Sequence, residues 1–411
     1  MGERNSAPGE PPYPGGRVRI HKKRILMRSR HHVVSMMLTL LLGDCLAIPT
    51  LGQVPPDTGL PVISIGRRQS VPSIILGDNV DLVVHLPGDY ASGGKRYPVL
   101  FFLGSDYRAK FALAAASLDY MNAQGQLPGM ILVGIDLPHG NFVLVPQESG
   151  GGTASADRHI AVLAQEIIPF VDRTFRTNGY SILYGGSNCG VFAVYALLTG
   201  RLPCRAYLAS SPMLGWCPTL IFDRAREAFA DSGRPQRFLF QVWSDDDFSR
   251  VTHDMPKFVE LLAKNAPNWL RWKSEIRHNE GHVPEMDLSL GLRALFPDYN
   301  PETGLMTLQD LQEHYAKLSN RYGFTIEVPE ALIFDVGLTL GNSGQLDEAQ
   351  RVFEYAVERY PQNADMHAGL GFVFKQRGNA AVAAGHLKKA LEIVPAHGWA
   401  RQQLNELQAP K

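Results

Sequence analysis

A serine in a glycine-rich segment carries the clearest chemical signal of the sequence. Ser187 stands in Tyr184-Gly-Gly-Ser-Asn-Cys-Gly190, between a predicted strand that ends at Tyr184 and a predicted helix over 191–198. A serine on a sharp strand-to-helix turn holds its hydroxyl out of the sheet, and its neighbours must be small because the backbones pass closely. The amide dipoles of the following helix favour negative charge at this turn. The segment therefore predicts a nucleophilic Ser187.

Glycine-rich turns also bind phosphate, which is the alternative interpretation of this segment. The chain contains no G-x-G-x-x-G fingerprint and no Gly-Lys-Ser/Thr. The stretch 88–95 only approximates a P-loop, because neither Ser nor Thr follows its lysine. A nucleotide site is therefore the weaker interpretation.

Three consecutive aspartates stand where an orienting acid is expected. A serine nucleophile needs a base and a group that orients the base, and in hydrolases with such a turn they follow the serine in the order acid, then histidine. Asp245–Asp247 come shortly after a predicted strand over 238–242. A solvated turn is the alternative. We favour Asp246 as the acid and keep Asp245 and Asp247 as alternatives.

Two histidines, His278 and His282, follow the next predicted strand, over 272–276. Either could be an ordinary surface histidine, but Gly281 and Pro284 shape a tight loop around His282, so we predict that His282 is the base. A metal site is not expected here, because H-x-x-x-H with an internal glycine makes a poor helix and the chain contains no H-E-x-x-H. No cofactor is expected either.

The oxyanion that forms when a serine attacks a carbonyl needs two N–H donors. One donor should be the backbone amide of Asn188, directly after the serine. The other should come from the loop after a predicted strand over 99–103, with Ser105 or Asp106 as the donor. The loop is also an ordinary turn, so its role depends on that of Ser187.

Apolar strands that alternate with helices must position these residues. The predicted strands cover 80–86, 99–103, 130–135, 181–184, 206–209, 238–242 and 272–276. Helical apolar spacing occurs between them, over 159–175 and 191–198. Near-continuous apolar strands separated by helices indicate a mostly parallel sheet covered on both faces, and so an α/β fold.

The C-terminal part of the sequence repeats itself with a period of 34 residues. The recurring positions are Gly337, Gly344, Phe353, Ala356 and Pro361, matched by Gly371, Gly378, Leu387, Ala390 and Pro395. Small residues at helix crossings and a proline after the second helix of each pair are typical of tetratricopeptide repeats. Two repeats are too few for a stable solenoid. We therefore expect them to dock on the catalytic domain or on a protein partner.

The N-terminal part is basic and then apolar. Residues 1–53 carry eight Lys/Arg against three acids, and they include an apolar run over 33–42 with small residues beyond it, at Thr50 and Gly52. This order predicts a secretory signal peptide, with a disordered basic tail as the alternative. The run is about half of the ~20 residues that span a bilayer, so no stable membrane span is expected. The predicted localisation is periplasmic or secreted.

These patterns divide the chain into four parts. They are a basic N-terminal region with a signal peptide over 1–52, an α/β domain over 53–300, a helical linker over 301–330 and helical repeats over 331–411. A hydrophobic content of 45% is enough for a sizeable core. A formal net charge of +0 gives the chain no attraction to nucleic acid.

The chain has four cysteines, too few for a disulfide scaffold. Cys45 lies in the predicted signal region, which leaves Cys189, Cys204 and Cys217. Export permits a Cys204–Cys217 disulfide, but three thiols cannot all pair.

Several motifs resemble those of the esterase-D-like α/β-hydrolases, a group that includes siderophore esterases, feruloyl and acetylxylan esterases and mycolyltransferases. The motifs are Leu86-Pro-Gly-Asp-Tyr90, Tyr97-Pro-Val-Leu-Phe-Phe-Leu103, Val133-Gly-Ile-Asp136, Glu166-Ile-Ile-Pro-Phe170, the turn at Ser187, Gly281-His-Val-Pro284 and Gly291-Leu-Arg-Ala-Leu-Phe296. The resemblance implies an α/β-hydrolase fold with a small all-α tetratricopeptide-like C-terminal domain. It also implies a serine esterase with Ser187 as nucleophile, His282 as base and the acid within Asp245–Asp247.

The sequence departs from the family pattern at three places. Gly186 and Cys189 replace a His and a Gly of the usual turn, Gly104-Ser105 stands where Asp-Gly or His-Gly is usual, and 137–142 lacks the usual Arg. Hydrolysis of carboxylic esters through an acyl-enzyme, of siderophore type or on acylated sugars, is the predicted function. The alternatives are acyl transfer by the same residues and a catalytically weak binding protein whose repeats recruit a partner.

Overall fold

The computed structural model describes residues 64–104, 108–136, 144–146, 154–302, 304 and 306–408. The chain divides into Met1–Pro61 and one compact unit, Val62–Lys411. The predicted signal peptide over 1–52 lies outside the described residues. None of the described helices has the length and apolar character that a membrane crossing requires.

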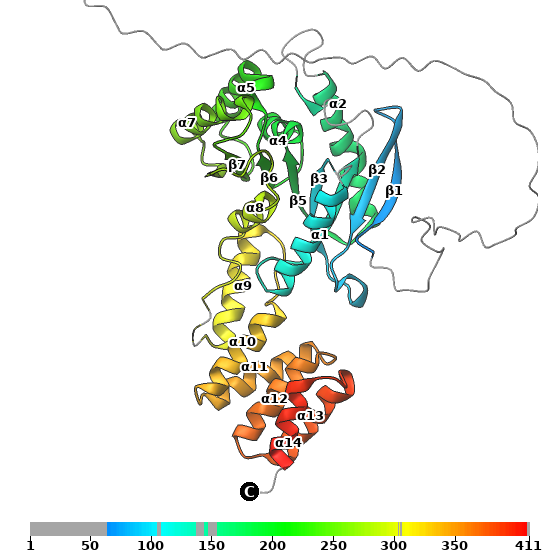
Figure 1. Ribbon diagram of the computed structural model, residues 1–411, viewed down its shortest axis with the longest axis vertical. Coiled ribbons are helices and arrows are strands. Elements are labelled where there is room, and N and C mark those ends of the chain that lie inside the picture. Colours follow the sequence, from blue (N-terminus) through cyan, green and yellow to red (C-terminus); the bar gives the residue numbers. More distant parts are fainter. Residues whose placement is uncertain are drawn as a thin grey trace, which may run out of the picture. The chain divides into compact units, whose positions relative to one another are not determined.

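An eight-stranded sheet is built from residues 67–277 of the compact unit, and the C-terminal helices extend from it (Figure 1). Its strands, in spatial order, are β1 (Arg67–Ser73), β2 (Asp78–His85), β4 (Ile131–Asp136), β3 (Tyr97–Leu103), β5 (Thr177–Gly186), β6 (Ala206–Ser210), β7 (Arg237–Ser244) and β8 (Leu270–Arg277). The strands β4, β3 and β5 to β8 run parallel, and β1 and β2 pair antiparallel at one edge. All seven predicted strands are confirmed. The sequence did not predict β1, which is mostly exposed and buries only Val71 and Ser73.

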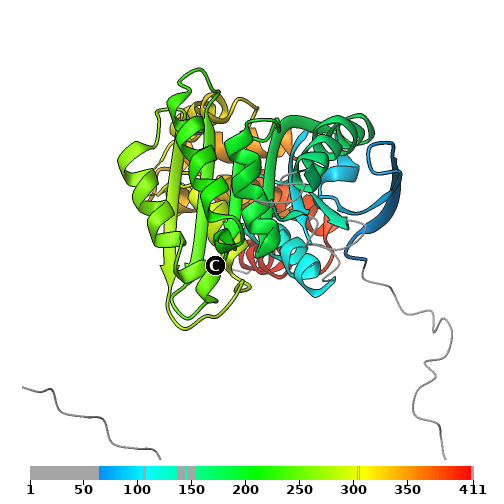
Figure 2. The ribbon, with the colours of Figure 1, turned by 90° about the horizontal axis from the view of Figure 1, so that it is seen from above.

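Helices cover both faces of the sheet (Figure 2). The helices and helical turns before the C-terminal region are η1 (Tyr90–Ser92), α1 (Arg108–Ala123), α2 (Ala154–Val162), η3 (Leu163–Ile167), α3 (Ile168–Thr174), α4 (Asn188–Thr199), η4 (Leu214–Trp216), α5 (Pro218–Ala230), α6 (Ser249–Thr252), α7 (Met255–Asn265) and α8 (Asp287–Leu295). Side chains alternate between the faces along a strand. In β3, Phe101 therefore packs in the core under α2 to α5, whereas Phe102 packs in the core under α1 and α8.

The core under α1 and α8 continues into the C-terminal helices. It includes Leu311 of α9 (Leu308–Tyr322), a helix within the predicted helical linker over 301–330, and Leu332 of α10 (Glu330–Asn342). The hydroxyl of Tyr322 donates to the carbonyl of Leu295, at the end of α8. The C-terminal helices therefore share an apolar core with one face of the sheet.

The 34-residue period is visible in the helix bounds. The pair α10 and α11 (Leu346–Arg359) is followed by the pair α12 (Ala364–Gln376) and α13 (Ala380–Ile393), so that each helix begins and ends 34 residues after its counterpart. A last helix, α14, covers Gly398–Gln408. Within each pair a glycine admits a large side chain: a Cβ on Gly337 would lie 2.6 Å from the Phe353 ring, and one on Gly371 would lie 2.8 Å from Leu387.

Candidate active site

Ser187 occupies a strained turn between β5 and α4. Its backbone angles are φ 59° and ψ −119°, a region that non-glycine residues rarely adopt. The backbone N–H of Ser187 donates to the carbonyl of Ser210 at 2.9 Å, and the carbonyl of Ser187 accepts from Gly190 and Val191. Strain of this kind costs about 1–3 kcal/mol and persists only where the surroundings enforce it. The predicted turn is present, with its serine half-buried at the carboxyl edge of the sheet.

The small neighbours of Ser187 are required by close packing. A Cβ on Gly185 would lie 2.3 Å from the carbonyl oxygen of Cys189, and one on Gly186 would lie 2.7 Å from Val283. The Cys189 side chain, which stands where glycine is usual, is accommodated in the core and buried there. The departure at Cys189 therefore leaves the turn intact.

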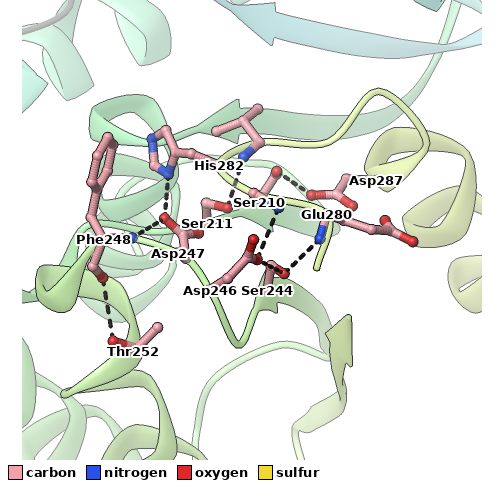
Figure 3. A network of polar contacts seen from close by, with 12 residues as sticks. Ser210, Ser211, Ser244, Asp246, Asp247, Phe248, Thr252, Glu280, His282 and Asp287 are labelled. Atoms are coloured by element: carbon pink, nitrogen blue, oxygen red, sulfur yellow. Dashed lines mark hydrogen bonds and ion pairs between the residues drawn. The ribbon is translucent and has the colours of Figure 1, made fainter. Parts of the chain in front are cut away.

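His282 pairs with Asp247 rather than with the favoured Asp246. The His282 Nδ1 and the Asp247 Oδ1 are 2.6 Å apart, and the Asp247 side chain is fully buried (Figure 3). With Nδ1 donating to the carboxylate, Nε2 of the neutral ring is left as an acceptor. In the chain, Asp247 and His282 follow Ser187 in the order Ser, Asp, His.

Asp246 supports the histidine loop instead. Its Oδ1 accepts from the Ser244 hydroxyl and, at 3.0 Å, from the backbone N–H of Gly281. These two hydrogen bonds hold the pKa of Asp246 below its usual range. The preference for Asp246 was therefore wrong about the partner of His282, because consecutive side chains in a turn point in different directions.

Asp245, the remaining alternative, contacts the other histidine. Its Oδ2 lies 2.6 Å from Nδ1 of His278, and its Oδ1 accepts from the Asn279 N–H at 3.1 Å. The hydrogen bond with His278 is the main reason that the pKa of Asp245 is lowered. Both residues are exposed, so this pair lies on the surface.

The loops around Ser187 and His282 contain strained backbone conformations. Among the described residues, positive φ occurs at four non-glycine positions, all at this edge of the sheet: Ser187, Ser211, Asn279 and Val283. The backbone N–H of Val283 donates to the Ser211 hydroxyl at 3.0 Å, which ties the loop after His282 to the end of β6. Backbone strain concentrated in this way is typical of functional sites.

Asn188, the predicted oxyanion donor, is the first residue of α4. The first backbone N–H groups of an α-helix have no acceptor within the helix, so the Asn188 amide can donate to an oxyanion. Its side-chain Oδ1 accepts from the Trp216 Nε1 at 3.0 Å, which anchors the residue. Ser105 and Asp106, the candidates for the second donor, lie outside the described residues.

One cavity brings three of the predicted residues together. It measures about 230 Å³, and its lining includes Ser187, Asn188 and His282, together with Gly104 at the end of β3. Ser187 and His282 are 95 positions apart in the chain, yet they line the same space. The ring of Phe248 packs 4.7 Å from the His282 ring, at the margin of the site.

A second buried carboxylate lies behind the turn and was not predicted. The Asp287 side chain, 1% exposed at the start of α8, accepts a hydrogen bond from the Ser210 hydroxyl (Figure 3). Its Oδ1 has no hydrogen-bond partner among the described residues, and burial raises the pKa of Asp287 to about 6. Since the Ser210 carbonyl accepts from the Ser187 N–H, Ser210 connects Asp287 to the turn at Ser187. In the sequence it resembles any acid at a helix start.

Comparison with known proteins supports this fold. Residues 73–268, just under half of the chain, match the family model described as "Putative esterase". No curated protein matches the chain.

Several solved structures are similar. An IroE-like serine hydrolase from Shewanella oneidensis matches with 24% identity and a TM-score of 0.62, over 72% of this chain and 99% of that one. An uncharacterised protein from Capnocytophaga ochracea DSM 7271 matches with 15% identity and a TM-score of 0.55, over 84% and 99%. The BES protein from Bacillus cereus matches with 18% identity and a TM-score of 0.50, over 59% and 98%. At these identities, the likeness shows that this chain and the three structures share a fold, which is α/β-hydrolase-like.

Proposed function

We propose that the protein is a serine hydrolase of carboxylic esters. The observation that carries this proposal is the single cavity lined by Ser187 on its strained turn and by His282, whose Nδ1 is paired with Asp247. The match of residues 73–268 to an esterase family model supports the same chemistry.

The mechanism follows from the roles of these groups. Ser187 attacks the ester carbonyl while Nε2 of His282 takes its proton, and the buried Asp247 holds the imidazole in the required tautomer. The Asn188 amide, with a donor from the loop after Gly104, stabilises the oxyanion. The histidine returns the proton to the leaving alcohol, and water then hydrolyses the acyl-enzyme by the same steps in reverse order.

Labelling by a fluorophosphonate probe and hydrolysis of short p-nitrophenyl esters test the proposal. Ser187→Ala should abolish labelling and lower kcat by about 10⁴–10⁶-fold. A Ser187→Ala variant with full activity would exclude Ser187 as the nucleophile. A folded wild-type protein that neither reacts with the probe nor hydrolyses any ester would exclude the proposed function.

An ester panel with siderophore trilactones and with feruloyl and acetyl sugars would then define the substrate. Added alcohols that compete with water for the acyl group would indicate acyl transfer instead.

A partner-binding role for the C-terminal helices is the second proposal. The 34-residue spacing of α10–α11 and α12–α13 supports tetratricopeptide-like repeats, which present helices to protein partners.

Export of the protein is a separate proposal, which rests on the sequence of residues 1–52 alone. Cell fractionation and sequencing of the mature N-terminus test export, and an intact protein recovered only from the cytoplasm would contradict it.

A further inference from the structure

A second cavity adjoins the one that contains Ser187. It also measures about 230 Å³, and four residues line both spaces: Phe102, Lys110, Tyr184 and Val283. Phe102 and Tyr184 stack with their ring centroids 4.9 Å apart, so the shared wall is largely aromatic. The second cavity therefore lies directly beside the one that contains Ser187.

One face of α1 forms the side of the second cavity. The lining residues Lys110, Leu113, Ala114 and Ser117 follow the i, i+3, i+4, i+7 spacing of a single helix face. The facing side comes from the loop after His282 and from α8, through Pro284, Glu285 and Leu288. Most of the lining side chains are apolar, and the charged ones are Lys110 and Glu285.

Large apolar side chains are also exposed beside the two cavities. Leu113, which lines the second cavity, is 42% exposed, and Met286, next to its lining residue Glu285, is 52% exposed. Phe248, whose ring contacts His282, is 58% exposed. Apolar side chains gathered around a concave site, rather than scattered singly, are typical of a surface that an apolar ligand covers.

We propose that this second cavity, between α1 and the loop after His282, binds an apolar alkyl or aryl group of the ester substrate. The inference rests on the proposed function, in which Ser187 attacks the ester carbonyl. Each methylene buried in the cavity should then raise kcat/KM about fourfold, until the space is filled. The apolar group belongs either to the acyl part or to the alcohol part of the ester, and the two are separated experimentally.

Ser117→Phe tests the proposal, because the added ring fills the cavity from a partly exposed helix position. Ala116→Phe is the matched control, since Ala116 is exposed on another face of α1 and does not line the cavity. The wild-type protein, both variants and a fallback, Leu113→Trp at the cavity margin, are compared on two ester series. One series lengthens the acyl chain from acetyl to octanoyl with p-nitrophenol constant, and the other lengthens an alkyl alcohol with acetate constant.

In the wild-type protein, kcat/KM should rise at least tenfold along one of the two series. Ser117→Phe should lower the ratio of the longest to the shortest substrate at least tenfold in that series, whereas Ala116→Phe should leave the ratio within twofold. The series that responds identifies the acyl or the alcohol part as the occupant. Should Ser117→Phe fail to fold, as judged by thermal melting, Leu113→Trp takes its place with the same expected result.

Two different failures are distinguishable. If the wild-type protein hydrolyses acetyl esters but neither series shows a length effect, or if Ala116→Phe changes the ratio as much as Ser117→Phe, the cavity assignment is overturned and the proposed function stands. If no ester is hydrolysed and no fluorophosphonate label is taken up, both are overturned.

Discussion

The carboxyl edge of the sheet and the C-terminal helices differ in which residue types adopt positive φ. At the sheet edge, positive φ falls on Ser187, Ser211, Asn279 and Val283, although glycine would adopt these angles without strain. In the described part of α10 to α14 and their connections, positive φ falls only on glycines such as Gly378. The edge therefore carries strain that the helical region avoids.

Polar groups show the same contrast. Near the site, one carboxylate oxygen each of Asp247 and Asp287 is buried with no hydrogen-bond partner among the described residues. In the helical region, the side chains of Asn363 and Asn379 cap α12 and α13 by accepting from backbone N–H groups. In a region whose role is packing, backbone and polar groups are expected to find hydrogen-bond partners close in the chain. Unpartnered polar groups and strained backbone are expected at functional sites instead. Substitutions at the edge should therefore change rates, and those in the helices should change stability.

The largest expected effect separates the two neighbouring aspartates. Asp247→Asn should lower kcat on p-nitrophenyl acetate by about 10⁴-fold, because an amide beside Nδ1 favours the wrong tautomer of His282. Asp246→Asn keeps an oxygen that accepts from Ser244 and Gly281, so its kcat should fall less than about tenfold. An equal loss in the two variants would mean that the histidine is not oriented by Asp247.

A single methyl group should destabilise the helical region. A Cβ on Gly369 of α12 would lie 2.2 Å from the fully buried Phe353 ring, so Gly369→Ala should lower the free energy of unfolding by about 3 kcal/mol. Urea denaturation measures this, and kcat of the folded variant should stay within twofold. In a double-mutant cycle with Phe353→Leu, most of the loss should disappear. A purely additive cycle would show that the ring is not the cause.

Asp287 should make stability depend on pH. Burial raises its pKa from 3.8 to about 6, so between these values the folded protein retains a proton that the unfolded chain has released. The free energy of unfolding should therefore fall as pH rises through this window and stay low above it, by about 2–3 kcal/mol in total.

Asp287→Asn removes this titration, so its free energy of unfolding should lack the decline between about pH 4 and 6 and should exceed that of the wild type at pH 7. Urea titrations from pH 4 to 8 measure both curves. Parallel curves for the two proteins would show that Asp287 is ionised normally in the folded state.

The smallest expected effect compares two glycines of the helical region. Gly378, in the turn before α13, has φ +76°, so Gly378→Ala should lower the free energy of unfolding by about 1 kcal/mol. Gly385 lies inside α13 with open space around its Cβ position, so Gly385→Ala should raise it by about 1 kcal/mol. Thermal or urea unfolding measures both. Two changes of the same sign would contradict the assignment of strain to the turn alone.

Local patterns in the sequence predicted much of this architecture. Seven strands, a helical linker over 301–330 and the 34-residue period were all predicted. Apolar runs and repeated small residues are recognisable in the sequence because they reflect contacts between residues that are close in the chain. The glycine-rich turn at Ser187 was recognisable for the same reason. The strand β1 was missed because it is mostly exposed and has almost no apolar pattern.

The tertiary structure alone decided what surrounds the serine. Three adjacent aspartates are equivalent in the sequence, and only the path of the turn after β7 determines that Asp247 faces His282. Asp287 differs from an ordinary surface acid only because α8 packs it against Ser210. The second cavity likewise exists because α1, β3 and the loop after His282 meet there. Patterns in the sequence reflect contacts between residues that are close in the chain. The surroundings of Asp247, Asp287 and the second cavity depend instead on packing between distant segments, which fixes where each side chain points and what it contacts.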